Sequence, residues 1–195
     1  STKSIKKTLK NKVYDTFIHA AGPHPHREQL DNKEILMENR QLLEKIESIF
    51  QKSEKVILIS SFVNLINYKK KKISEDNQIQ SYKDDNFYKK SKYETEKFFY
   101  ELQNKYKNNL IIIYPCHVIG PEDYNISPNV AFFKNVMKKK INYYMDINYP
   151  LTDVREISSY IDFIIEKNLN SHNKIIITGS LKMIDYIKKI KKKRE

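Results

Sequence analysis

The chain has 195 residues, of which 39% are apolar and 31% are charged, and its formal net charge is +12. This length supports one domain, or one and a half, with a substantial hydrophobic core. No apolar run is long enough to cross a bilayer and no secretory signal is visible, so a cytoplasmic protein without membrane contact is expected. The single cysteine, Cys116, excludes an internal disulfide framework and any multi-thiolate metal site.

The positive charge is spread along the chain. Lysine is abundant together with Asn, Ile and Tyr, a composition typical of AT-rich coding sequence. Of the two lysine clusters, Lys69–Lys72 lies in a polar stretch typical of a solvated insertion, and Lys188–Arg194 ends a predicted helix, where cations suit the helix dipole. The basic residues are not interleaved with aromatic ones as in proteins that bind single strands. Nucleic-acid binding is therefore not predicted.

Short apolar runs alternate with amphipathic stretches along the first part of the chain. In chain order they predict a strand over 13–19, a helix over 33–50, a strand over 55–60, a polar excursion over 67–86, a helix over 88–106 and a strand over 110–114. The strand over 55–60 is apolar throughout, as a strand covered on both faces should be. The alternation predicts an α/β fold, with a doubly wound parallel sheet and covering helices.

The pattern loosens after Pro121. Helices are predicted over 130–139, 154–168 and 183–192, with a short strand over 174–178. Pro121 and Pro128 bracket a polar loop, which marks a boundary between two regions. We therefore divide the chain into residues 1–125, which hold the sheet, and a smaller region at 126–195.

The clearest chemical signal is Tyr88-Lys-Lys-Ser-Lys92. Tyrosine and lysine four residues apart lie on one helix face, so the ammonium can lower the pKa of the phenol and fit it for proton transfer. In a lysine-rich chain this spacing also arises by chance. The position of Ser61 supports the chemical interpretation, because a serine at the carboxyl end of a parallel strand points into the crevice where such sheets bind ligands. Its neighbour Ser60 is interpreted as a serine that caps the next segment.

Together with two loops at strand ends, these pieces resemble the extended short-chain dehydrogenase/reductase family, the NAD(P)-dependent epimerase/dehydratase group. The matching segments, in family order, are His19–Ala21, Ser60–Ser61, Tyr88–Glu96, Tyr114–Pro121 and Leu151–Ile157. Tyr114–Pro121 is similar to the family's Arg-Pro-x-x-Val-x-Gly-Pro loop beside the nicotinamide. The resemblance implies a Rossmann-like dinucleotide-binding domain over 1–125, incomplete at its N-terminus, and a substrate-binding region over 126–195.

The resemblance also implies roles for single residues. Tyr88 would be the general acid/base, Lys92 would lower its pKa and hold the nicotinamide ribose, and Ser61 would hydrogen-bond the substrate oxygen. The side chains implied to line NAD or NADP, besides Tyr88 and Lys92, are Ala20, Ala21, Pro115, His117 and Val118. His24, in a proline-rich loop, would contact a small-molecule substrate. A homodimer through the active-site helix is also implied.

Several positions depart from the family pattern. The three glycines, Gly22, Gly120 and Gly179, are too far apart to form the family's glycine-rich turn, so a fragment or truncated gene model is predicted. The strand over 13–19 would then have an open edge. Tyr114 replaces the family arginine, which puts the nicotinamide contact in doubt. Asn39 lies near the family's helix asparagine, at a shorter spacing from Ser61.

The remaining candidate residues have structural interpretations. His24 and His26 could ligate a metal ion, but no third ligand is near in sequence, and no metal is predicted. Asp153 is expected to cap a helix, and Cys116 to be buried. The methionines Met37 and Met137 are expected to fill the core.

Two functions from different classes are compatible with these residues. The first is an NAD(P)-dependent oxidoreductase that transfers hydride at a carbonyl or alcohol carbon, with a sugar-nucleotide epimerase/dehydratase as the alternative within the family. The second is a family relative that has lost turnover and acts as a binding or assembly module. The triad of Ser61, Tyr88 and Lys92 favours the enzyme, and the altered loop at Tyr114 favours the inactive relative.

Overall fold

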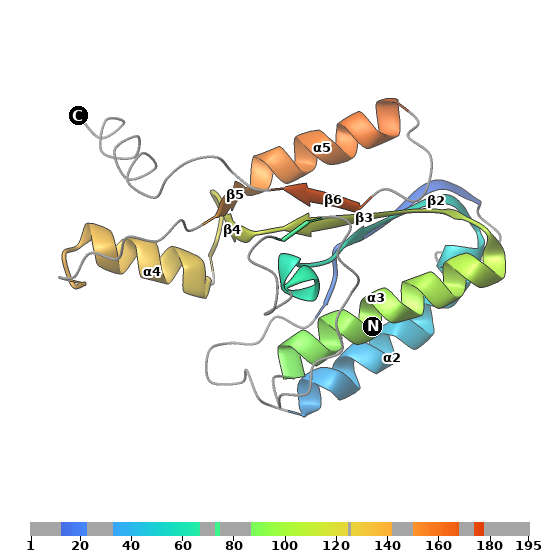
Figure 1. Cartoon of the computed structure of the whole chain (residues 1–195), viewed down its shortest axis with the longest axis horizontal. Helices are drawn as coiled ribbons and strands as arrows, with labels where there is room; N and C mark the ends of the chain where they lie inside the picture. Colours follow the sequence, from blue (N-terminus) through green and yellow to red (C-terminus); the bar gives the residue numbers. More distant parts are fainter. Residues whose placement is uncertain are drawn as a thin grey trace.

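A four-stranded parallel sheet forms the centre of the protein (Figure 1). The computed structural model describes residues 13–22, 33–66, 73–74, 87–124, 126–141, 150–167 and 174–177. The strands, in the spatial order β1-β2-β3-β6, are Tyr14–His19, Ser53–Ile59, Asn109–Pro115 and Lys174–Ile177. The register places Phe17 opposite Val56, and Val56 opposite Leu110. The predicted α/β fold with a parallel sheet is therefore confirmed.

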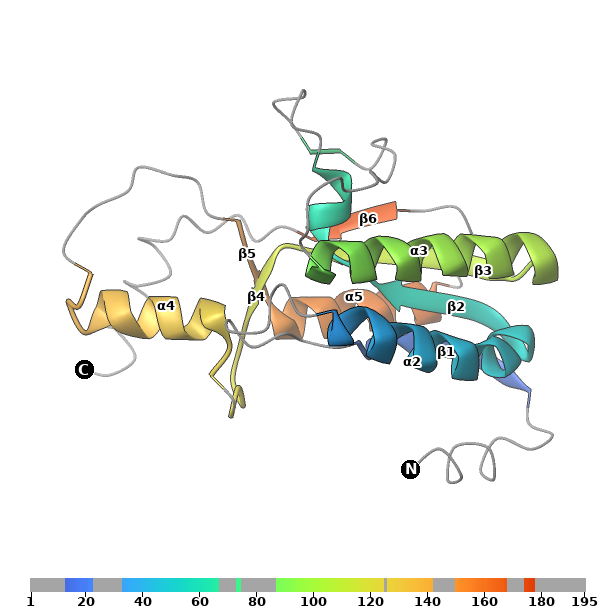
Figure 2. The same ribbon diagram turned by 90° about the horizontal axis from the view of Figure 1, so that it is seen from below.

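Helices cover both faces of this sheet, as the two views show (Figures 1 and 2). Helices α2 (Glu34–Gln51) and α3 (Phe87–Tyr106) lie side by side on one face, and α5 (Val154–Glu166) lies on the other. The side chains of β2 alternate accordingly, because successive residues of a strand point to opposite faces. Val56 and Leu58 pack toward α2 and α3, whereas Ile57 packs toward α5.

The side of the sheet that faces α2 and α3 holds the larger core cluster. Phe50 of α2 and Phe99 of α3 are fully buried, and their rings meet edge to face at 5.6 Å between centroids. Burying one such ring contributes about 1.5–3 kcal/mol. This packing fixes α3, and therefore the start of α3, relative to the ends of the strands.

A second, smaller unit follows β3. Strand β4 (His117–Ile119) pairs in parallel with β5 (Leu151–Asp153), and α4 (Pro128–Met137) packs beside them. A short 3-10 helix, η2 (Phe62–Leu65), follows β2. The segments after β2 and after β3 thus leave the sheet at the same end, because the two strands are parallel.

The start of α5 is closely packed against the loop after β4. A Cβ atom at Gly120 would overlap the side chain of Val154, so only glycine fits there without movement. Asp153 accepts a hydrogen bond from Arg155 N at 2.9 Å, and Glu156 accepts one from Asp153 N at 3.3 Å. This capping box confirms the predicted role of Asp153.

The structure also tests several other sequence predictions. The predicted strand over 174–178 is β6, which pairs with β3, so it joins the main sheet although it belongs to the region 126–195. The helix expected over 183–192 and nearly all of the polar excursion lie outside the described residues. The core assignment of Met37 is wrong, because its side chain lies on the outward face of α2 and is 60% exposed.

Strand β1 lies at an edge of the sheet. Among the described strands its neighbour is β2, as the predicted edge position requires. Ile18 is 40% exposed and Val13, just before the strand, is 75% exposed. Apolar side chains therefore flank an edge whose backbone groups can pair with another strand.

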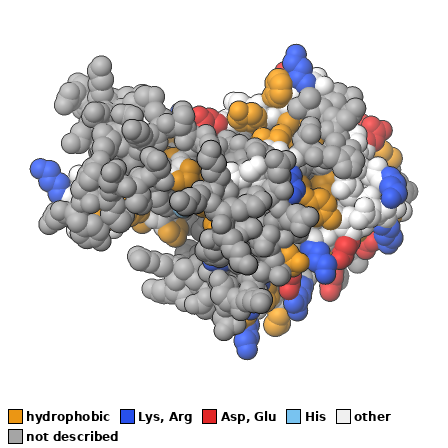
Figure 3. All heavy atoms as spheres, in the orientation of Figure 1, with side chains coloured by type: hydrophobic (Ala, Val, Ile, Leu, Met, Phe, Trp, Pro, Cys, Tyr) orange, Lys and Arg blue, Asp and Glu red, His pale blue; other side chains and the backbone are white. Residues whose placement is uncertain are grey.

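The described charges are mixed on the face shown in Figure 3, where Lys and Arg side chains stand among Asp and Glu. An example of such mixing is the exposed pair of Arg40 and Glu94, with 2.7 Å between Nη2 and Oε1. None of the helices in the described ranges combines the length and apolarity that crossing a bilayer requires.

Candidate active site

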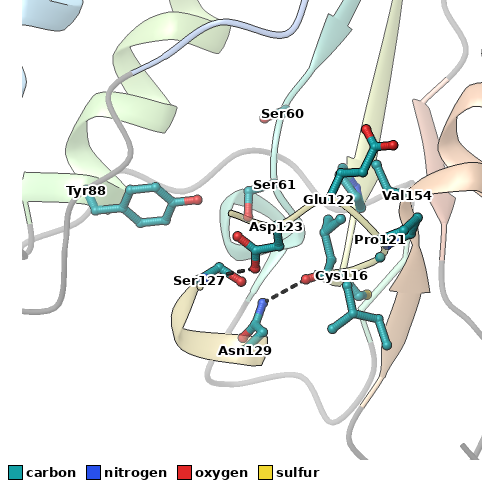
Figure 4. A pocket seen from close by; sticks show the side chains of 14 residues that line it. Ser60, Ser61, Tyr88, Cys116, Pro121, Glu122, Asp123, Ser127, Asn129 and Val154 are labelled. Atoms are coloured by element: carbon teal, nitrogen blue, oxygen red, sulfur yellow. Dashed lines mark hydrogen bonds between the residues drawn. The ribbon is translucent and has the colours of Figure 1, made fainter. Parts of the chain in front are cut away.

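A cavity of about 370 Å³ opens where β2 and β3 end (Figure 4). Its lining comes from the segment after β2, the start of α3, the segments around β4, and the starts of α4 and α5. The lining residues are Ser60, Ser61, Tyr88, Pro115, Cys116, Val118, Ile119, Gly120, Pro121, Glu122, Asp123, Ser127, Asn129 and Val154. The cavity therefore lies at the carboxyl ends of the strands, where ligands of open α/β sheets bind.

Ser61 and Tyr88 meet in this cavity, although 27 positions separate them in the chain. The Tyr88 hydroxyl points toward Ser61 (Figure 4), and interaction with the Ser61 side chain lowers the pKa of Tyr88 in part. Ser61 has an extended backbone and begins η2, where its Oγ accepts a hydrogen bond from Val63 N at 3.5 Å. The serine is thus both a helix cap and a neighbour of the phenol.

Lys92 follows Tyr88 by one turn of α3, with its Nζ 5.7 Å from the centre of the Tyr88 ring. Burial lowers the pKa of Lys92. Burial also raises the pKa of Tyr88 above its ordinary 10.0, and the hydrogen bond with Ser61 opposes this only in part. In the protein without a bound ligand, the pKa of Tyr88 is therefore raised rather than lowered as expected, and the phenol is protonated at neutral pH.

The segment after β1 approaches the same amine. A Cβ atom at Gly22 would lie 3.6 Å from Lys92 Nζ, and Ala20 and Ala21 beside it are exposed. His19, the last residue of β1, is buried, and its pKa is lowered to about 4 by burial and by the charge of Lys92. Small residues thus lie beside the ammonium.

Pro115 at the end of β3 and Val118 in β4 line the cavity, and their contact with a cofactor stays a prediction. His117 is placed elsewhere, since its ring packs 5.1 Å from that of Phe62 and its Nδ1 lies 3.1 Å from the carbonyl oxygen of Pro150. Cys116 is buried, and burial raises the pKa of its thiol to about 11, which makes the thiol a poor nucleophile at neutral pH.

Tyr114 does not line the cavity. Its side chain is fully buried on the α3 side of the sheet, where its hydroxyl donates to Glu96 Oε1. Replacement of the family arginine at this position therefore places a buried phenol in the core beneath α3, and its expected effect on the nicotinamide contact stays a prediction. The sequence interpretation missed Glu96 as a site component, although it lies one turn beyond Lys92 on the same helix.

The sequence interpretation also did not identify the residues that form the far wall of the cavity, Asp123, Ser127 and Asn129. Asp123 Oδ2 accepts a hydrogen bond from Ser127 N at 2.8 Å, and Asn129 Nδ2 donates to Val118 O at 3.3 Å (Figure 4). Ser127 also caps α4 by accepting from Val130 N. The polar loop bracketed by two prolines was the available signal.

Two further candidates lie away from the cavity lining. Asn39 is buried between helices, where its Nδ2 donates to Ser91 O at 3.2 Å and to Thr95 Oγ1 at 3.0 Å, so it ties α2 to α3. His24 lies outside the described residues. Within the described ranges, no group of three or more His, Cys, Asp or Glu side chains is arranged to hold a metal ion.

Solved structures with the same fold are numerous. The protein RMD from Pseudomonas aeruginosa, complexed with NADPH, has a TM-score of 0.69 and 16% identity over 96% of this chain and 69% of its own. A UDP-N-acetylglucosamine 4-epimerase from Methanobrevibacter ruminantium M1, in complex with UDP-N-acetylmuramic acid, has a TM-score of 0.69 and 17% identity over 96% and 62%. A dTDP-glucose 4,6-dehydratase from Bacillus anthracis, in complex with NAD, has a TM-score of 0.66 and 15% identity over 97% and 60%.

The chain thus spans about 60–69% of the length of these three proteins. No curated protein sequence matches it. The family model described as "NAD dependent epimerase/dehydratase family" matches residues 1–179, which is most of the chain. Since that model extends across both the main sheet and the smaller β4–β5 unit, the chain belongs to the NAD dependent epimerase/dehydratase family.

Proposed function

We propose that this protein catalyses NAD(P)-dependent hydride transfer at an alcohol or carbonyl carbon, with Tyr88 as the general acid/base. The observation that carries the proposal is the placement of the Tyr88 and Ser61 side chains in one cavity, with the Tyr88 hydroxyl pointing toward Ser61 (Figure 4). Lys92 one turn further along α3 supports it. A hydroxyl, a phenol and an ammonium that converge at a strand end form the donor set that proton transfer to a carbonyl oxygen needs.

In the reducing direction, the Ser61 hydroxyl donates a hydrogen bond to the substrate carbonyl oxygen. Tyr88 gives its proton to that oxygen as the carbon accepts a hydride, which leaves an alcohol and a phenolate. The raised pKa of Tyr88 keeps the phenol protonated and ready for this step. In the oxidising direction Tyr88 must start as phenolate, and the Lys92 ammonium is the described group placed to stabilise that charge.

The residues beside Lys92 suit the reactive end of a dinucleotide. A nicotinamide, when bound, would supply or accept the hydride. Lys92 would hold the ribose hydroxyls, and the small residues Ala20, Ala21 and Gly22 lie in the segment beside it, where a Cβ at Gly22 would lie 3.6 Å from the amine. Pro115 and Val118 would contact the ring from the opposite wall. The chain has no glycine-rich turn, so this assignment covers the nicotinamide end alone.

The substrate side of the cavity is polar. Asp123, Ser127 and Asn129 line it opposite Tyr88, which suits a small molecule that carries several hydroxyl groups. The sugar-nucleotide epimerase/dehydratase alternative is favoured by the names of similar structures, two of which act on UDP-N-acetylglucosamine and dTDP-glucose. The division into 1–125 and 126–195, a substrate contact by His24 and a dimer through α3 belong to the same proposal.

The substitution Tyr88→Phe tests the proposal in the protein expressed from its complete gene. We expect kcat to fall by about 10²–10⁴-fold, because the phenol proton is lost while the ring stays in place. Turnover is measured with UDP-N-acetylglucosamine and dTDP-glucose, with NAD and NADPH. A net change in NADPH absorbance indicates an oxidoreductase, whereas product formed without net cofactor consumption indicates an epimerase or dehydratase.

Tyr160→Phe is the matched control, because this tyrosine lies on α5, is 46% exposed and does not line the cavity. It should leave kcat unchanged. Full turnover in the Tyr88→Phe protein would contradict the assignment of the acid/base. Survival of the cellular function without turnover would support the inactive, binding relative.

A further inference from the structure

A carboxyl group is buried directly behind the proposed site. Glu96 lies on α3 one turn beyond Lys92, and its side chain is fully buried. Its Oε2 accepts hydrogen bonds from Ser60 Oγ at 2.9 Å and from Asn64 Nδ2 at 2.8 Å, and its Oε1 accepts one from the Tyr114 hydroxyl. Three neutral donors, two from the segment after β2 and one from β3, therefore converge on one carboxyl group.

Two of these donors are continuous with the residues that carry the chemistry. Ser60 precedes Ser61 in the chain, and its backbone N–H donates to Ile113 O at 2.8 Å, which holds this segment on β3. Asn64 Nδ2 also donates to the carbonyl oxygen of Lys92 at 3.1 Å. The Glu96 carboxyl thus connects the segment that carries Ser61 with the helix that carries Lys92.

The side-chain amide of Asn64 is oriented by the groups to which it donates. Asn64 is fully buried, and its Nδ2 lies within hydrogen-bond distance of Glu96, of Lys92 O and, at 3.3 Å, of Ser60 Oγ. Its Oδ1 is buried without a hydrogen-bond partner. An unpaired buried acceptor destabilises the fold, so the orientation of this amide is set by the groups to which it donates.

We propose that Glu96 is a positioning residue of the site, which fixes the segment of Ser61 against α3 so that the Ser61 and Tyr88 hydroxyls stay in contact, with Tyr114 as the anchor on β3. This inference rests on the proposed hydride-transfer function. It also gives a reason for a polar network in a place where apolar side chains of the same volume would stabilise the core at least as well.

The ionisation of Glu96 agrees with a carboxyl held by neutral groups. Burial raises its pKa, while the hydrogen bonds from Tyr114, Asn64 and Ser60 and the charge of Lys174 lower it in part. A glutamine at position 96 would keep one acceptor oxygen for Ser60 and Asn64. It would also present an N–H to the Tyr114 oxygen. Glu96→Gln is therefore the conservative variant, and Glu96→Leu removes every acceptor at similar volume.

The experiment compares Glu96→Leu, Glu96→Gln and the control Glu101→Leu in the protein from its complete gene. Glu101 lies on the same helix, but its side chain is 62% exposed and pairs only loosely with Lys97, at 3.9 Å. We expect Glu96→Leu to lower kcat about tenfold or more with KM changed less than about twofold, since the bound state is kept and the hydroxyls are misplaced. Glu96→Gln should restore most of kcat, and Glu101→Leu should change neither constant.

A second readout is independent of turnover. Amide hydrogen exchange should become faster at η2, residues 62–65, in Glu96→Leu and remain unchanged in β2 and β3. If the wild-type protein turns over none of the tested substrates, the proposed function fails while this exchange pattern still tests the positioning role. If Glu96→Leu does not fold, Tyr114→Phe takes its place, because Tyr114 lies outside the cavity and its hydroxyl donates to Glu96.

Two results would overturn the inference. One is wild-type kcat in folded Glu96→Leu and Tyr114→Phe proteins with unchanged exchange at η2. The other is faster exchange spread evenly over η2, β2 and β3 with no recovery in Glu96→Gln, which would make Glu96 a general core residue.

Discussion

His19 shows how one buried side chain can make stability depend on pH. Its ring packs between those of Phe17 and Phe99, at 6.1 Å and 5.1 Å between centroids, and its pKa is lowered from 6.5 to about 4. In the unfolded chain the imidazole takes up a proton below pH 6.5, whereas in the folded chain it stays neutral. The free energy of unfolding therefore falls as the pH falls from 6.5 toward 4, by about 3 kcal/mol in total.

The substitution His19→Phe removes this titration. We expect its unfolding free energy, measured by urea denaturation at pH 7 and pH 4.5, to drop less than that of the wild type over this interval, because phenylalanine has no proton to take up. An equal drop in the two proteins would show that other groups carry the acid sensitivity.

At the scale of single elements, helix α5 depends on its N-terminal cap. Asp153 and Glu156 satisfy backbone N–H groups that have no partner inside the helix. Asp153→Ala should therefore cost about 1 kcal/mol and lower Tm by about 2–4 °C. Differential scanning calorimetry measures this, with the exposed Asp162→Ala in the same helix as the control. Equal Tm values for the two variants would contradict the capping role.

The elements themselves could be predicted from the sequence, because apolar periodicity is a local property. The strand over 55–60 and the helix over 88–106 differ from β2 and α3 by only a few residues at their ends. Met37 was assigned to the core from its residue type and not from an apolar stripe, and a residue type alone does not show which helix face a side chain occupies. The elements that flank the cavity were thus predictable and their edges less so.

The site was only partly predictable for the same physical reason. Tyr88 and Lys92 lie one turn apart on one helix, so their spacing alone brings them together. Glu96 meets Asn64 across 32 positions and Tyr114 across 18, and nothing local in the sequence signals such polar contacts. Asn39 meets Thr95 across 56 positions and was assigned by spacing rather than by contact.

At the scale of the whole molecule, the edge of β1 is a place where a strand of a second molecule could pair. Its neighbour among the described strands is β2, and Ile18 is 40% exposed on this edge strand. A charged side chain blunts such an edge. We expect Ile18→Lys to reduce concentration-dependent self-association, measured by sedimentation velocity, with the exposed Ile165→Lys on α5 as control. Equal association in both variants would place the contact elsewhere.

The position of β6 beside β3 has a consequence for biosynthesis. Lys174 pairs with Ile112 and is translated 62 residues after it, which at ordinary ribosome speeds takes about 3–12 s. During that interval β3, the most apolar strand, can pair with β2 but has no β6 on its other flank. The nascent polypeptide therefore passes through a stage in which a chaperone could bind this flank, before the last strand is added.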